Sequence, residues 1–245
     1  MFFNPGSLIL FIACTLLSLL AAGYVKLRFA RGQQVPLRSG MTGAEVAQAI
    51  LRDNDVRDVT VHEHQGFLSD HYSPTAKTLN LSSAVYHGTD AAAAGVAAHE
   101  VGHALQHAQG SLSMWGRTVL VYPAHFGQTL APWLIMAGLM MGAAHQAAHH
   151  VHGLAYMIAV GGVAMFGLAT LCSLVIVANE FNASARARVA LMRLGITRPG
   201  EEDEAVRGVL TAAGLTYVAA AVTAIAQLLY WAMQAGLLGG RSDDR

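Results

Sequence analysis

The sequence segment best suited to chemistry is a His-Glu-x-x-His pattern at positions 99–103. It lies in an alanine-rich run, from about Asp90 to Gln109, that we expect to be helical. Residues four apart share one face of a helix, so His99 and His103 can offer two imidazole rings to one metal ion. Zn²⁺ binds neutral imidazole and, in catalytic sites, keeps one position open for water. Glu100 is placed to act on that water as a general base. A chance match on an amphipathic helix is the competing interpretation, and the small apolar flanks argue against it.

A third metal ligand is needed, and two residues are candidates. His107 lies one further turn along the same helix face, about 6 Å along the axis from His103, and we expect it to lie outside the ligand set. Glu180 is the first formally charged residue after Arg117 and directly follows a long apolar segment. A carboxylate at the end of a membrane helix needs a partner, which a metal ion would provide. Two histidines and a glutamate form a known catalytic zinc set, so Glu180 is the preferred third ligand.

The composition is that of a membrane protein. Of the 245 residues, 54% are apolar and only 12% are charged, against about 25% charged in an ordinary soluble domain. The formal net charge of +0 gives no indication of a nucleic-acid partner. We therefore predict a mainly α-helical, polytopic membrane protein in a lipid bilayer, with about four transmembrane helices and a small α+β, zincin-like catalytic region.

Four segments have the length needed to cross a hydrocarbon core, which takes about 20 apolar residues. Pro123, His125 and Pro132 interrupt the beginning of the second, so we expect a kink or a peripheral lead-in there. The predicted spans are Leu8–Val25, Val119–Gly142, Leu154–Ala178 and Val209–Met233. The chain would then divide into an anchor (1–26), the region with the His-Glu-x-x-His helix (27–117), two spans with a His-rich link (118–178), the segment with the third ligand (179–208), and a last span with a short tail (209–245).

Lysine and arginine counts predict the orientation. The segment 26–117 holds eight of these residues and the segment 179–208 holds five, whereas the link 143–153 holds none. Because basic loops stay inside, both basic segments should be cytoplasmic. His99, His103 and Glu180 would then lie on one side of the membrane. The cluster of His145, His149, His150 and His152 would lie on the other side, as a solvated loop.

Short elements should surround the metal-binding helix. Thr42 and Glu45 have the spacing of a capping box, so a helix should begin there and end by about Asp53–Asp55. Residues 59–62 and 78–82 alternate like strands, with a turn expected at 70–74. These strands form a small hairpin or sheet, which either holds an extended peptide beside the metal or only covers the helix. His71, next to Tyr72, is a candidate donor to the oxyanion.

The whole sequence resembles the YugP-like neutral zinc metallopeptidases, a bacterial membrane family. The resemblance implies a membrane-bound, zinc-dependent peptidase of the bacterial plasma membrane, with His99 and His103 as ligands and Glu100 as the catalytic residue. Gluzincins often have Asp four residues after the ligand Glu, where this chain has Ser184, so we expect Asn179 or Asn182 to orient a zinc histidine instead. The segments that carry the resemblance are Asp70–Pro74, Leu79–Ser82, Ala97–Gln106, Glu180–Ser184 and Ala212–Ala221.

The leading functional prediction is a zinc metalloendopeptidase that hydrolyses a peptide or protein substrate through a zinc-activated water. One alternative is an intramembrane protease, but the Leu-Asp-Gly motif of that class is missing from the sequence. A second alternative is a non-catalytic, zinc-binding membrane scaffold. Glu100 argues against the scaffold, because metal binding alone does not need it.

Overall fold

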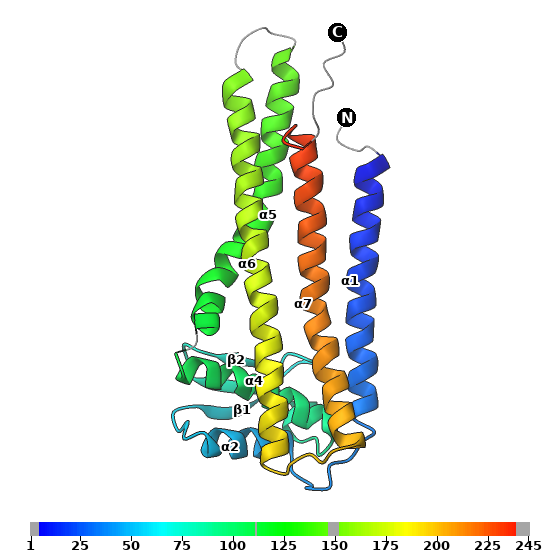
Figure 1. The fold of residues 1–245 in the computed structure, drawn as a ribbon, viewed down its shortest axis with the longest axis vertical. Coiled ribbons are helices and arrows are strands. Elements are labelled where there is room, and N and C mark those ends of the chain that lie inside the picture. Colours follow the sequence, from blue (N-terminus) through cyan, green and yellow to red (C-terminus); the bar gives the residue numbers. More distant parts are fainter. Residues whose placement is uncertain (1–4, 111, 147–151, 239–245) are drawn as a thin grey trace. The chain divides into compact units, whose positions relative to one another are not determined.

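The computed structural model describes residues 5–110, 112–146 and 152–238. Most of them are helical, and a small sheet lies between the second and third helices in chain order (Figure 1). The elements are α1 (Pro5–Gly32), α2 (Gly43–Asp53), β1 (Thr60–His64), β2 (His71–Ser73), β3 (Thr78–Ser82), α3 (Ser83–Tyr86), α4 (Ala91–Ala108), α5 (Leu112–Gln146), α6 (His152–Arg193) and α7 (Glu201–Gln234). The mainly α-helical fold with a small α+β region is thus as predicted.

The chain forms two compact units. The helical unit comprises Met1–Leu17, Thr118–Ile176 and Ala219–Arg245, and the mixed unit comprises Ser18–Arg117 and Val177–Val218. In the helical unit, Ile135 of α5 and Val163 of α6 belong to one buried apolar cluster with Ala232 of α7.

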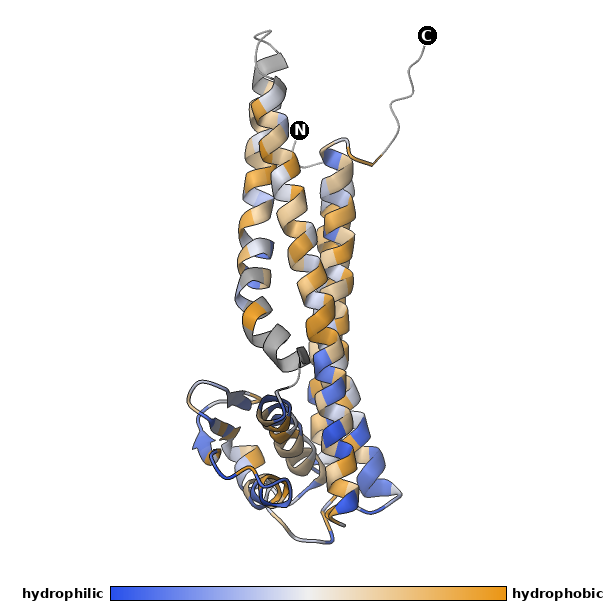
Figure 2. Cartoon of the chain, turned by 60° about the vertical axis from the view of Figure 1, so that its left-hand side comes forward, coloured by the Kyte–Doolittle hydropathy of each residue, from blue (hydrophilic) through white to orange (hydrophobic). Residues whose placement is uncertain are grey.

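Among the described residues, four helices are long and apolar enough to cross a membrane: α1, residues 124–143 of α5, residues 153–193 of α6, and α7. Figure 2 shows the apolar residues that run along them. This agrees with the predicted number of candidate spans, but the helices extend beyond the predicted bounds. α1 continues to Gly32, past the predicted end of the first span at Val25. α6 continues past Glu180 to Arg193, which makes the proposed third ligand part of a helix.

In the mixed unit, the sheet has the strand order β1-β3-β2. β1 pairs with β3 in parallel, and β2 pairs with β3 in antiparallel register, with Tyr72 opposite Leu79. The strands near 59–62 and at 78–82 were predicted. The expected turn at 70–74 is wrong in part, because residues 71–73 form β2. Leu79 and Tyr72 are both buried, so the core fixes this short strand although Pro74 follows it.

Helix α4 lies at the centre of the mixed unit. The carboxylate of Asp90 caps its first turn by accepting a hydrogen bond from the amide of Ala93, at 2.9 Å. Most of the helix is buried, and small alanine side chains let its neighbours approach closely. α2 packs against it and begins with the predicted capping box of Thr42 and Glu45.

Candidate metal centre

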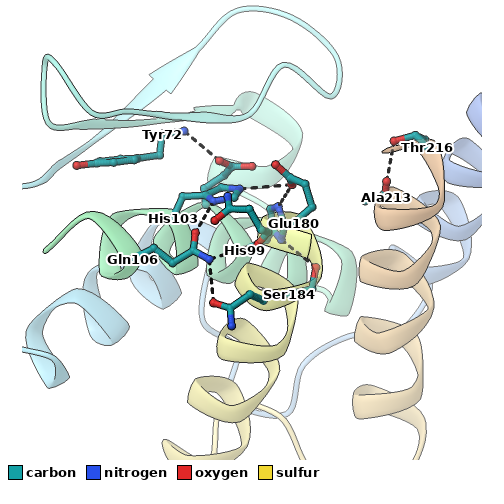
Figure 3. A network of polar contacts seen from close by, with 11 residues as sticks. Tyr72, His99, His103, Gln106, Glu180, Ser184, Ala213 and Thr216 are labelled. Atoms are coloured by element: carbon teal, nitrogen blue, oxygen red, sulfur yellow. Dashed lines mark hydrogen bonds and ion pairs between the residues drawn. The ribbon is translucent and has the colours of Figure 1, made fainter. Parts of the chain in front are cut away.

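Three side chains from two helices of the mixed unit converge on one point. His99 and His103 come from α4 and Glu180 from α6, and the ligand-capable atoms of the three lie within 4.8 Å of one another. Oε2 of Glu180 is 3.2 Å from Nε2 of His99 and 3.5 Å from Nε2 of His103 (Figure 3). The side chains of His103 and Glu180 are each 1% exposed. Two imidazole nitrogens aimed at one buried carboxylate are a donor set that suits Zn²⁺.

A glycine lets the two helices approach each other. A Cβ atom at Gly102 would lie 2.7 Å from the carbonyl oxygen of Ala183 in α6, which is too close for any side chain. The same addition at Gly95, two turns earlier in α4, would meet Val206 at an ordinary 3.5 Å. The fourth residue of the His-Glu-x-x-His pattern therefore sets the distance between α4 and α6, and so between the histidines and Glu180.

The imidazole of His99 has its second nitrogen paired with α6. Its Nδ1 lies 3.1 Å from Oγ of Ser184, one helical turn beyond Glu180. The prediction that Asn179 or Asn182 orients this histidine is therefore wrong, because Ser184 contacts it. Because Glu180 and Ser184 are four residues apart, one face of α6 contacts both nitrogens of the same ring.

The imidazole of His103 has a different partner, which the sequence analysis missed. Its Nδ1 lies 3.0 Å from Oε1 of Gln106, a fully buried residue one turn further along α4. Nε2 of Gln106 donates to Oδ1 of Asn182 at 2.9 Å and to the carbonyl oxygen of Asn179 at 3.3 Å. Asn179 and Asn182 thus contact Gln106, and Gln106 in turn contacts the histidine. Gln106 could have been found from the sequence, because it follows His103 by three residues on one helix and side chains at that spacing are neighbours.

Glu100 is buried beside the cluster without belonging to it. Its Oε2 accepts a hydrogen bond from the backbone amide of Tyr72 in β2, at 3.0 Å. This contact joins the short sheet to α4 and fixes the direction of the carboxylate. The strand that was expected to be a turn therefore positions the candidate general base.

The two further histidines considered from sequence lie outside the cluster. Nδ1 of His107 is 2.8 Å from the hydroxyl of Tyr72, which agrees with its exclusion from the ligand set. His71 is exposed, with Nδ1 2.9 Å from the carbonyl oxygen of Ser69 and Nε2 3.2 Å from Nδ2 of Asn80. The structure does not bring His71 to the metal centre as an oxyanion donor. His149 and His150 of the His-rich link lie outside the described residues.

A partly buried carboxylate ties the sheet to the loop that precedes β2. Asp70 accepts hydrogen bonds from the backbone amide of Ser82 at 2.7 Å and from its hydroxyl at 3.0 Å. Burial raises the pKa of Asp70 above its usual value, and the two Ser82 bonds offset part of that rise. This contact holds the loop next to α4 and the metal cluster.

The fold and the cluster define a mainly α-helical membrane protein with a His-His-Glu group that could hold a metal ion. A family model described as "Putative neutral zinc metallopeptidase" matches residues 7–236. The "Putative membrane protease YugP" of Bacillus subtilis (strain 168) is 38% identical over 233 residues, which cover 95% of this chain and 97% of the relative. The chain belongs to this zinc metallopeptidase family, as its sequence motifs predicted. No solved structure matches it.

Proposed function

We propose that the protein is a membrane-bound metallopeptidase that uses one Zn²⁺ held by His99, His103 and Glu180. The observation that carries this proposal is the convergence of two imidazole Nε2 atoms and one carboxylate oxygen within 4.8 Å. Membership of a zinc metallopeptidase family supports the choice of metal. A bound zinc ion would supply a Lewis acid that polarises the scissile carbonyl group and lowers the pKa of a bound water.

Glu100 would supply the proton transfers. Its carboxylate takes the proton from the attacking water and returns it to the departing amide nitrogen, so that the peptide bond is exchanged for an acid and an amine. The amide of Tyr72 holds Oε2 of Glu100 in place. Ser184 and Gln106 hold the two imidazole rings in fixed orientations, so the ligand nitrogens need little reorganisation.

The proposed substrate is a peptide or protein, cleaved within the chain. The proposed location is the bacterial plasma membrane, which the chain crosses several times with the metal centre on the cytoplasmic side. The excess of lysine and arginine in the segments 26–117 and 179–208 supports this orientation.

The test compares the purified wild type with Glu100→Gln, which keeps the shape of the side chain and removes the proton acceptor. Both forms should carry about one equivalent of zinc, whereas cleavage by the variant should fall at least about a hundredfold, the lower end of what general base catalysis contributes. Cleavage at the wild-type rate by Glu100→Gln would show that another group is the base.

Zinc content of ligand variants tests the metal assignment separately. His103→Ala and Glu180→Ala should each lose most of the metal. Full retention of zinc in both would exclude this ligand set. Stoichiometric zinc in a wild type that cleaves nothing across a broad peptide panel would favour the scaffold alternative.

A further inference from the structure

An apolar cavity of about 200 Å³ adjoins the candidate metal centre inside the mixed unit. Phe29 of α1, Val96 of α4 and Ala213 of α7 are among its walls, and His99 and Glu100 line it as well. A group bound in this cavity would therefore lie directly beside the reacting atoms. The mechanism described above makes no use of this space.

The polar groups that line the cavity are mostly engaged within the protein. The carboxylate of Asp70 accepts its hydrogen bonds from Ser82. The hydroxyl of Thr216 donates to the carbonyl oxygen of Ala213 at 2.7 Å, as Figure 3 shows. With these groups paired, the interior offers mainly aliphatic and aromatic surface to a ligand. Pockets of this kind select by apolar contact and size.

The size of the cavity suits a large amino-acid side chain. A cavity of about 150 Å³ lined by apolar residues is known to accept benzene. A cavity of about 200 Å³ therefore has room for the side chain of leucine or phenylalanine.

We propose that this cavity is a specificity pocket for a large apolar side chain on the substrate residue next to the scissile bond. The proposal rests on the proposed function, because a peptide gives the cavity an occupant that also reaches Glu100 and the metal. A single methylene in such a pocket changes selectivity about 10- to 200-fold. The peptidase should therefore prefer leucine or phenylalanine over glycine at this position.

Binding of zinc-chelating peptide hydroxamates tests the pocket without requiring catalysis. Three compounds that differ only in the side chain next to the hydroxamate, namely that of glycine, leucine or lysine, are titrated into the zinc-loaded protein in detergent. The leucine compound should bind at least about tenfold more tightly than the glycine compound. The lysine compound should show no such gain. Equal affinities of the leucine and glycine compounds would overturn the assignment of this cavity as a specificity pocket.

The variant Ala213→Phe should fill the cavity and remove the preference for leucine, while the glycine compound still binds. Thr211→Phe is the matched control, because Thr211 is exposed on the same helix and does not line the cavity. It should keep the wild-type preference. Val96→Ala enlarges the cavity and should move the preference towards a naphthyl side chain, so the proposal stays testable if Ala213→Phe does not fold. An unchanged leucine preference in both cavity variants would overturn the pocket.

The results separate the pocket from the proposed function. A bound glycine compound with no gain for leucine would reject the pocket and leave the peptidase proposal intact. A leucine preference in a protein that cleaves no peptide would support the pocket and count against catalysis. Acyl chains found by mass spectrometry in the wild type, but not in Ala213→Phe, would instead identify a lipid as the occupant and overturn the proposal.

Discussion

Oε1 of Gln106 lies 3.0 Å from Nδ1 of His103, and the surroundings of Gln106 fix the direction of this contact. The amide nitrogen of Gln106 faces the carbonyl oxygen of Asn179, which can only accept. The amide oxygen must therefore face the imidazole, which places a proton on Nδ1 of His103. Nε2 of that ring then presents its lone pair towards Glu180, the form that a metal ion needs.

Replacement of Gln106 should weaken metal binding. Gln106→Met keeps the size of the side chain and removes the acceptor, so the zinc affinity should fall about 10- to 100-fold, as is typical for loss of a group that orients a ligand. Gln106→Glu retains an acceptor oxygen and should recover part of the affinity. Competition with a chelating dye measures these affinities. Gln109→Met, at an exposed position near the end of α4, is the control, and equal affinity in all variants would refute the orienting role.

Gly102→Ala should separate α4 from α6. The added Cβ would lie 2.7 Å from the carbonyl oxygen of Ala183, so the helices must move apart and the cluster of His99, His103 and Glu180 must open. Zinc content and thermal stability should both fall.

Gly95→Ala is the matched control for this change. The new methyl group meets Val206 at 3.5 Å, and alanine favours the helix by about 1 kcal/mol relative to glycine. Thermal unfolding of this variant should match or exceed that of the wild type, with full zinc content. Similar behaviour of the two alanine variants would show that Gly102 does not set the helix separation.

The pH dependence of stability should reflect Asp70. Because burial raises its pKa in the folded state, folding favours the neutral acid. Its contribution to the free energy of unfolding is complete below the unfolded pKa of about 3.9 and is lost as the pH rises through the higher folded value. Asp70→Asn should therefore gain thermal stability relative to the wild type as the pH rises above about 4.

Asp58 provides a control of opposite sign. Its exposed carboxylate accepts a hydrogen bond from Lys77, which lowers the pKa of Asp58. Asp58→Asn should lose a little stability relative to the wild type as the pH rises through the same range. Parallel pH profiles for the two asparagine variants would contradict the assignment for Asp70.

The proposed orientation can be tested with reporters of membrane side. Reporters at Gln33 and Gly200 should both be cytoplasmic, since each lies in a segment rich in lysine and arginine, and a reporter at Gln146 should be external. Alkaline phosphatase and fluorescent protein fusions distinguish the two sides. Placement of Gln33 and Gly200 on opposite sides would contradict the topology.

Local patterns predicted much of the fold. The capping box of Thr42 and Glu45, the strand at 78–82 and the helix of His99 each follow from residues close together in the chain. The pairing of His99 with Ser184 and the bond from Tyr72 to Glu100 depend instead on the approach of distant segments. The distance between these segments cannot be derived from the sequence, because it is set by packing at positions such as Gly102. The three-residue strand β2 was missed for the same reason.

The cluster joins segments of the chain that lie 81 residues apart, from His99 to Glu180. A zinc ion bound there would act as a reversible cross-link that closes this long loop, which contains α5 and most of α6. A ligand that binds only the folded state stabilises it by an amount that rises with the logarithm of the ligand concentration over Kd. Chelation should therefore make the protein easier to degrade as well as inactive, so that its lifetime in a cell would follow the supply of metal.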